Sequence, residues 1–136
     1  HIRVFQNLPN PVNVLTTHSA WLMSSLVMGA NGLLSGAGSV IAPLQVRLFN
    51  AVKNNNLKEA KDINDKIFPL VQLFYKPPFL DMHNRMKETL VILNAMKKAV
   101  VRPPLMKLPF EEIEELKNTV NAINLDNKLN FVKLVV

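Results

Sequence analysis

Residues 4–46 contain no lysine, arginine, aspartate or glutamate, although the chain of 136 residues carries 16 basic and 10 acidic side chains. Such a stretch can belong to a membrane span or to backbone buried inside a protein. All four glycines of the chain and Pro43 interrupt it, whereas a spanning helix needs about 20 predominantly apolar residues. We therefore expect a buried α/β core, in which parallel strands are apolar on both faces, and no membrane partner.

Two short apolar segments within this stretch predict β-strands, residues 12–16 and residues 33–35. Between them, residues 20–28 predict a mostly apolar helix, with Ser19 as its N-cap and Gly29 at its C-terminal end. Strands joined by a helix are parallel, and the crossover is right-handed. Because two strands do not form a stable isolated sheet, we expect them to be the last strands of a larger parallel sheet whose earlier strands lie outside this chain.

After the second strand the pattern is helical. Ser39 is expected to cap a helix that reaches about Lys53. Asn56 is expected to cap the next helix, because its apolar residues recur at spacings of three and four and Glu59 stands three positions later, as in a capping box.

Two further helices are predicted, one capped by Asp81 and one with Pro109 in its first turn. His83 and Arg85 are expected on a solvated face of the first. The apolar face of the second is expected to be Phe110, Ile113, Leu116, Val120 and Ile123. Its first turns carry Glu111, Glu112, Glu114 and Glu115. The helix dipole favours negative charge there, so dipole compensation explains these glutamates without catalysis.

The net charge of the chain is +6, with no run of like charges beyond Lys97-Lys98. Nucleic-acid binding needs basic side chains gathered on one face, so we expect a solvated helical surface and no nucleic-acid partner. A basic helical nucleic-acid binder stays open as an alternative. Cysteine is absent, which excludes disulfides, thiolate metal sites and thiol nucleophiles and is compatible with a cytoplasmic protein.

Gly36, Ala37 and Gly38 follow the second strand and open a helix, an arrangement that can hold an anion on free backbone N–H groups. A dinucleotide fingerprint requires a third glycine where Ile41 stands, so a tight turn is the favoured interpretation. His18 follows the first strand, but no carboxylate neighbours it in the sequence. We expect a turn or surface residue there rather than a general base, and we expect neither a cofactor nor a metal site.

Three sequence features in a fixed order carry a family resemblance: the segment Gly29-Ala30-Asn31-Gly32-Leu33-Leu34-Ser35, the positions Ala60…Pro69-Leu70, and the segment Arg102-Pro103-Pro104-Leu105. Together, residues 3–125 resemble the C-terminal half of the dihydrodipicolinate synthase / N-acetylneuraminate lyase superfamily. Residues 78–87 resemble a branch of that family near the 2-keto acid aldolases and dehydratases.

The resemblance implies a (β/α)8 barrel, the TIM barrel, followed by a C-terminal helical appendage. Residues 1–54 would be the last βα units of the barrel, residues 55–125 the C-terminal helical region and residues 126–136 a tail of unknown order. A whole barrel takes about 250 residues. The chain is therefore expected to be the C-terminal portion of an α/β barrel, with its last two parallel strands, numbers seven and eight.

The family forms a Schiff base between pyruvate, or a related 2-keto acid, and a lysine at the end of barrel strand six. That lysine, the proton-relaying tyrosine of strand five and the threonine/serine pair after strand two would all lie upstream of His1, so no catalytic residue is carried over. The fragment is expected to be inactive alone, and whether it is an enzyme is left open. The parent would be a homo-oligomeric lyase; the alternative is a non-catalytic half-barrel that associates with itself or with a partner chain.

The resemblance carries over only substrate-binding positions at the strand ends: Thr16, Thr17, Leu34, Ser35 and Gly36. The carboxyl ends of barrel strands hold active sites, which supports these positions independently. Thr17 and His18 stand where the family commonly has glycine and aspartate, and Ser39 stands near a common asparagine. The bulk at Thr17 argues against the dipicolinate substrate. The resemblance itself implies a small 2-keto acid as the substrate class.

Overall fold

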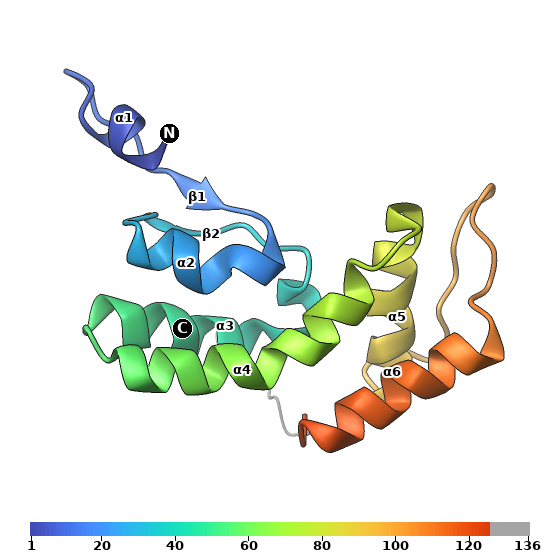
Figure 1. Cartoon of the computed structure of the whole chain (residues 1–136). Helices are drawn as coiled ribbons and strands as arrows, with labels where there is room; N and C mark the ends of the chain where they lie inside the picture. The colour runs from blue at the N-terminus through green and yellow to red at the C-terminus, as the bar shows by residue number, and fades with distance from the viewer. Residues whose placement is uncertain (126–136) are drawn as a thin grey trace. The chain divides into compact units, whose positions relative to one another are not determined.

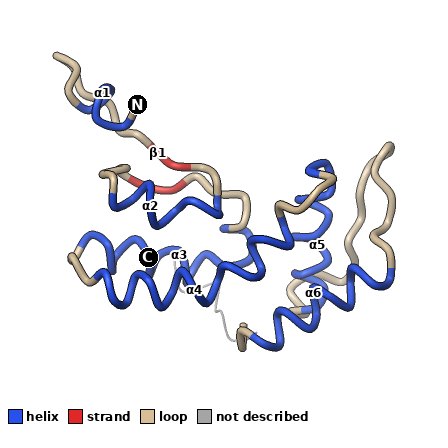
Figure 2. Tube along the Cα trace, in the orientation of Figure 1, coloured by secondary structure: helices blue, strands red, loops and turns tan. Residues whose placement is uncertain are grey.

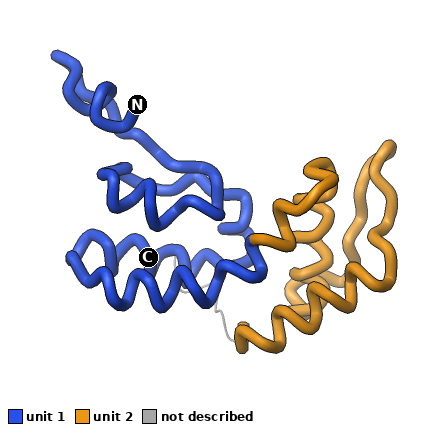
Figure 3. Tube along the Cα trace, in the orientation of Figure 1, with its two compact units in different colours: residues 1–71 blue, residues 72–136 orange. Residues whose placement is uncertain are grey.

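The computed structural model describes residues 1–125, so the predicted tail lies outside the described residues. The chain forms two compact units, residues 1–71 and residues 72–136 (Figure 3). The predicted division between residues 54 and 55 is of another kind, because it separates barrel from helical appendage; it stays a prediction.

The first unit contains a two-stranded sheet and the helices around it (Figure 1). Its elements are α1 Ile2–Gln6, β1 Leu15–Thr16, the short 3-10 helix η1 Ser19–Trp21, α2 Leu22–Val27, β2 Gly32–Leu33, α3 Gly38–Lys53 and most of α4 Leu57–Phe74. The second unit contains η2 Phe79–Asp81, α5 Met82–Ile92 and α6 Phe110–Ala122. No helix among residues 1–125 is long and apolar enough to cross a membrane.

β1 and β2 pair in parallel, with Leu15 opposite Gly32 and Thr16 opposite Leu33 (Figure 2). The parallel pairing and the connecting helix α2 confirm the predicted βαβ arrangement. Both strands are shorter than predicted, and β2 begins one residue earlier, at Gly32. Just before the two strands, Asn31 pairs with Val14 partly through its side chain rather than through a regular pair of backbone hydrogen bonds. Its side-chain Oδ1 accepts a hydrogen bond from the Val14 N–H at 2.8 Å, and its own N–H donates to the Val14 carbonyl at 2.8 Å.

The two serines predicted as helix N-caps have other roles. His18 occupies the cap of η1, and its Nδ1 accepts a hydrogen bond from the Ala20 N–H at 3.3 Å. The Ser19 hydroxyl instead lies 2.6 Å from that of Ser35. The Ser39 hydroxyl donates to the Gly36 carbonyl at 2.9 Å, inside the turn that leads into α3. Both hydroxyls are therefore used by the turns rather than by the helices.

Gly29 and Asn56 confirm the predicted helix ends. Gly29 has a φ of +100°, the left-handed region that glycine enters at low cost after a helix. The Asn56 side-chain oxygen accepts from the Glu59 N–H at 3.2 Å, and its amide donates to the Glu59 carboxylate at 3.0 Å. Arg47 on α3 also pairs with Glu59 at 3.4 Å, which joins α3 to the beginning of α4.

The core of the first unit lies among α2, α3 and α4. α3 bends at Ile41, whose backbone is not helical, two residues before Pro43; proline removes a helical hydrogen bond and kinks the chain. The buried apolar side chains of α2 and α3 are Leu22, Leu26, Val40, Ile41, Leu44, Leu48 and Ala51. Those of α4 in this unit are Ala60, Ile63, Ile67, Leu70 and Val71. On the exposed face of α4, Asp65 raises the pKa of Lys61 by accepting a hydrogen bond from its amine.

In the second unit α5 packs against α6 around a buried arginine. Arg85 is 0% exposed, so the solvated position expected for it is wrong; His83 is exposed, as expected. The guanidinium pairs through Nε with Glu112 of α6. It also donates to the backbone carbonyls that follow α4, those of Phe74, Lys76, Pro77 and Pro78. An arginine has five N–H donors in a fixed arrangement. Here these donors connect α5 to α6 and to the backbone at the end of α4 and in the turn after it.

The glutamates at the start of α6 do more than balance the helix dipole. Glu112 pairs with Arg85 and lies 3.8 Å from Lys76, which also pairs with Glu115 at 2.6 Å. Phe110, expected to be buried, is 72% exposed. The buried residues of α6 are instead Leu116 and Val120, and Glu112 in its first turn takes part in ion pairs.

Replacing Arg85 with methionine should lower the free energy of unfolding by about 3–5 kcal/mol, because Glu112 then loses the partner of a largely buried pair. Urea denaturation of the 136-residue chain measures this change. The matched control is Lys58→Met, which breaks the exposed Lys58–Asp62 pair and should cost only about 0–1 kcal/mol. Equal losses for the two variants would contradict the role assigned to Arg85.

Candidate functional site

The carboxyl ends of β1 and β2 form one edge of the sheet, because parallel strands run in the same direction. The segment after β1 holds Thr17 and His18, and the segment after β2 holds Leu34 and Ser35. The Leu34 N–H donates to the Thr16 carbonyl at 2.8 Å, which fixes the two strand ends side by side. The predicted substrate-binding residues therefore lie on neighbouring segments at one edge.

Their environments differ. Thr16 and Ser35 are half-buried, whereas Thr17 and Gly36 are exposed. Leu34 is 67% exposed, so it is not covered by the described part of the chain. Of the five predicted positions, Ser35 takes part in two side-chain hydrogen bonds through its hydroxyl, and the Gly36 carbonyl accepts one from the Ser39 hydroxyl.

Ser35 belongs to a buried group of polar side chains that we call the strand-end cluster, formed by Ser19, Ser35 and Gln45. The Ser35 hydroxyl lies 2.6 Å from that of Ser19, and the Gln45 Nε2 donates to it at 2.9 Å. Ser19 is 3% exposed and Gln45 is 5% exposed. Buried polar groups are hydrogen-bonded in native proteins, and these three satisfy one another across the turn after β1, the end of β2 and α3.

The sequence reasoning missed Ser19 and Gln45 as members of this cluster. The available signal for Gln45 was its position beside Leu44 on the apolar side of the helix, where a polar side chain needs a buried partner. No signal in the sequence indicated that the Ser19 hydroxyl would pair with that of Ser35, because the position of Ser19 fitted a helix cap equally well.

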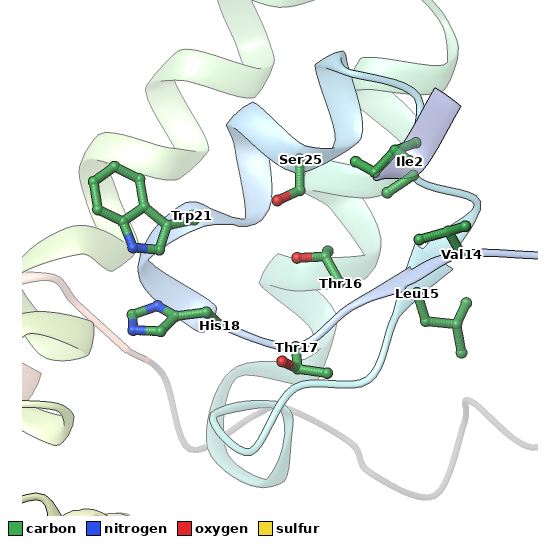
Figure 4. A pocket seen from close by; sticks show the side chains of 9 residues that line it. Ile2, Val14, Leu15, Thr16, Thr17, His18, Trp21 and Ser25 are labelled. Carbon is green, nitrogen blue, oxygen red and sulfur yellow. The ribbon is translucent and has the colours of Figure 1, made fainter. Parts of the chain in front are cut away.

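A pocket of about 360 Å³ lies beside β1 (Figure 4). Its lining consists of Ile2, Val14, Leu15, Thr16, Thr17, His18, Trp21, Ser25 and Ala30. Successive residues of a strand point to opposite faces of the sheet, yet five consecutive residues, 14–18, line the one pocket. The pocket therefore follows the edge of β1 that β2 does not occupy. Thr16 and Thr17 lie in it; Leu34, Ser35 and Gly36 do not line it.

His18 and Trp21 border the end of this pocket that lies beyond the strand. Their ring centroids are 6.4 Å apart, and the Trp21 side chain is exposed. Because the His18 Nδ1 already accepts the Ala20 N–H, its local role is that of a capping residue. Among residues 1–125, no group of three or more His, Cys, Asp or Glu side chains is placed to hold a metal ion.

The side chains at this edge can orient a ligand through hydroxyl and amide hydrogen bonds. The nine residues that line the pocket include no lysine, and the first lysine of the chain is Lys53. Imine formation with a carbonyl compound needs an amine nucleophile. The edge therefore has the groups to hold a carbonyl or carboxylate oxygen, and the described residues that line the pocket beside it supply no lysine to attack the carbonyl carbon.

The comparisons with known proteins decide the family. The model of the dihydrodipicolinate synthetase family matches residues 1–123. The chain belongs to the dihydrodipicolinate synthetase family. No curated protein sequence matches it.

Solved structures of this family's enzymes share the fold of the chain. A monomeric dihydrodipicolinate synthase variant superimposes with a TM-score of 0.82 at 18% identity, covering 91% of this chain and 40% of that one. N-acetylneuraminate lyase from Fusobacterium nucleatum gives a TM-score of 0.75 at 20% identity, covering 89% of this chain and 40% of the lyase. A catalytic lysine mutant of the sialic acid aldolase from Ruminococcus gnavus gives 0.78 at 22% identity, covering 90% and 40%.

The chain thus spans about two fifths of the length of these dihydrodipicolinate synthase and lyase structures. The resemblance drawn from the sequence motifs is confirmed at the level of the family and of an α/β fold with parallel strands. The assignment of Thr16, Thr17, Leu34, Ser35 and Gly36 to substrate binding stays a prediction.

Proposed function

We propose that this chain supplies the last two βα units and the C-terminal helices of a Schiff-base-forming lyase or aldolase that acts on pyruvate or a related 2-keto acid. The observation that carries the proposal is the parallel pairing of β1 with β2 within a family match to residues 1–123. In a (β/α)8 barrel these would be the seventh and eighth strands, and their carboxyl ends would face the active site.

The catalytic amine would come from outside these 136 residues. The sialic acid aldolase from Ruminococcus gnavus has a catalytic lysine. This chain carries no lysine before Lys53. A carbonyl substrate held at the strand ends would therefore meet hydroxyl groups from this chain and an amine from the preceding strands.

Each predicted position has a role that its chemistry supports. The hydroxyls of Thr16, Thr17 and Ser35 would donate to substrate oxygens, and the exposed Leu34 would pack against the carbon chain of the substrate. Gly36 would leave room for the substrate in the loop after β2. The whole enzyme would be a cytoplasmic homo-oligomer without a cofactor.

The free edge of β1 supports the same proposal. Val14 and Thr16 accept hydrogen bonds from the β2 side, so the backbone groups of Leu15 between them point to the open side of the strand. An unpaired strand edge is a template for another strand, and the pocket beside β1 follows this edge. The sixth barrel strand would occupy it.

Treatment of the isolated chain with pyruvate and borohydride should leave no covalent adduct on a lysine, because no lysine is among the described residues that line the pocket at the strand ends. Intact-mass spectrometry measures the outcome. A family member with its lysine in place, treated in parallel, is the positive control. A stable adduct on this chain at a stoichiometry equal to the control would contradict the proposal that the nucleophile lies elsewhere.

Co-expression with a polypeptide that carries the preceding six βα units of a family barrel should give a stable complex with pyruvate-dependent lyase activity. Leu15→Pro should abolish complex formation, because proline removes the N–H that faces the open edge. Leu15→Thr keeps that N–H and is the matched control. Copurification and activity assays check both, and equal binding of the two variants would contradict a strand–strand contact at this edge.

The second candidate function is a non-catalytic half-barrel that associates with itself. The exposed side chains of Leu15 and Leu34 beside the open strand edges favour it. Multi-angle light scattering across a concentration series separates the two candidates. Self-association predicts a mass that rises with concentration and a loss of that rise in Leu15→Pro; a monomer at every concentration would leave the first proposal alone.

A further inference from the structure

The strand-end cluster joins three segments that are separate in the sequence. Ser19 begins η1 in the turn after β1, Ser35 follows β2, and Gln45 lies in the middle of α3. Two successive hydrogen bonds connect Gln45 to both of the other segments: its amide donates to the Ser35 hydroxyl, and the Ser35 hydroxyl lies 2.6 Å from that of Ser19. A change at Gln45 can therefore reach the turn after β1 without any direct contact.

Gln45 contacts the loop after β2 at a second point. A Cβ built on Gly38 would lie 3.1 Å from the Gln45 Oε1, which is closer than most such contacts. The side chain is thus held between Ser35 and Gly38, the two ends of the loop that contains Gly36. Glycine at position 38 leaves the room in which the glutamine amide lies.

The direction of the hydrogen bonds follows from the amide. A glutamine Nε2 can only donate, so the Ser35 oxygen accepts from Gln45. One lone pair and the hydroxyl proton of Ser35 remain, and Ser19 uses one of them. Gln45 therefore sets the orientation of the Ser35 hydroxyl, which is half-buried at the strand end.

We propose that Gln45 is a positioning residue that couples the turn after β1 to the loop after β2 through the Ser35 and Ser19 hydroxyls. Barrel active sites take their groups from several strand-end segments, and such groups must be held to within about 0.5 Å to act together. The coupling would hold Thr17 and Ser35 at a fixed separation. Only the identity of the ligand between them rests on the proposed function.

Amide hydrogen exchange of the full 136-residue chain, followed by NMR, tests the coupling. The reporters in the turn after β1 are the amides of Ala20 and Trp21, which donate to the His18 side chain and carbonyl. The reporters for the loop after β2 are the amides of Gly38 and Ser39 at the start of α3, which donate to the loop carbonyls of Ser35 and Gly36. Gln45→Met keeps the length of the side chain and removes its polar atoms. The loss of one net hydrogen bond corresponds to about a fivefold faster exchange, which we expect at both sets of reporters.

Leu48→Met is the matched control, because Leu48 is a buried residue of the same helix without a polar group and a swap of similar volume is tolerated. It should leave both sets of reporters within about twofold of the wild type. Faster exchange in the loop alone after Gln45→Met, with Ala20 and Trp21 unchanged, would overturn the coupling. Equal effects of Leu48→Met and Gln45→Met would overturn it as well.

A second pair of variants tests the route from the strand end and does not depend on the folding of Gln45→Met. Ser35→Ala removes the hydroxyl that links Gln45 to Ser19 and should speed exchange at Ala20 and Trp21 about fivefold. Ser35→Thr keeps the hydroxyl and should restore wild-type exchange there. Indistinguishable exchange in the two variants would overturn the coupling. No activity is measured, so failure here leaves the proposed lyase function untouched, and the reverse also holds.

Discussion

The parallel pairing of β1 with β2 is the constraint on which the first unit depends. Parallel neighbours cannot be joined by a tight turn, so η1 and α2 must carry the chain back across the sheet before β2 begins. The same pairing brings both carboxyl ends to one edge, where Thr17 and Ser35 lie on adjacent segments. It also leaves the outer edge of β1 without a partner among the described residues, and two strands alone are too few for a stable sheet. The fold of the first unit and the position of the candidate site therefore follow from one pairing.

Each unit contains a buried polar side chain that orders the segments around it. In the first unit Gln45 holds the loop after β2 through Ser35; in the second, Arg85 holds the turn after α4 through its carbonyls and α6 through Glu112. Apolar packing is tolerant of shape, whereas a hydrogen bond to a buried donor fails if its partner moves. These two side chains thus fix loop geometry that the surrounding leucines and valines do not specify.

The sequence was sufficient for features set by neighbouring residues and insufficient for those set by distant ones. The parallel strand pair, the glycine that ends α2 and the capping box of Asn56 with Glu59 depend on local backbone chemistry, and all were predicted. Ser19 and Ser39 fitted a local rule for helix caps, but Ser19 took a more favourable partner across the sheet. Arg85 was expected on a solvated face. Its burial is tolerable because Glu112 on α6 and the carbonyls at the end of α4 and after it accept its hydrogen bonds. Phe110 fits the apolar spacing of α6 but is exposed, because it lies at the first residue of the helix and the buried side chains are those of Leu116 and Val120 further along.

The chemical groups at the strand ends suit one of the two tasks of an active site: they can hold a substrate, but they do not include the group that would activate it. Hydroxyl groups are present on both segments, and the pocket beside β1 contains no amine, so this part of the chain can orient an oxygen atom and cannot form an imine with it. Hydroxyl donors discriminate between substrates by leaving a buried group unpaired when the wrong one binds. Under the proposed function, the bulkier Thr17 and His18 after β1 would act in the same sense, because they would narrow the substrate space that a glycine and a smaller acidic side chain would leave. Substrate choice would then lie in these 136 residues, while the reaction step itself would depend on the strands that complete the sheet.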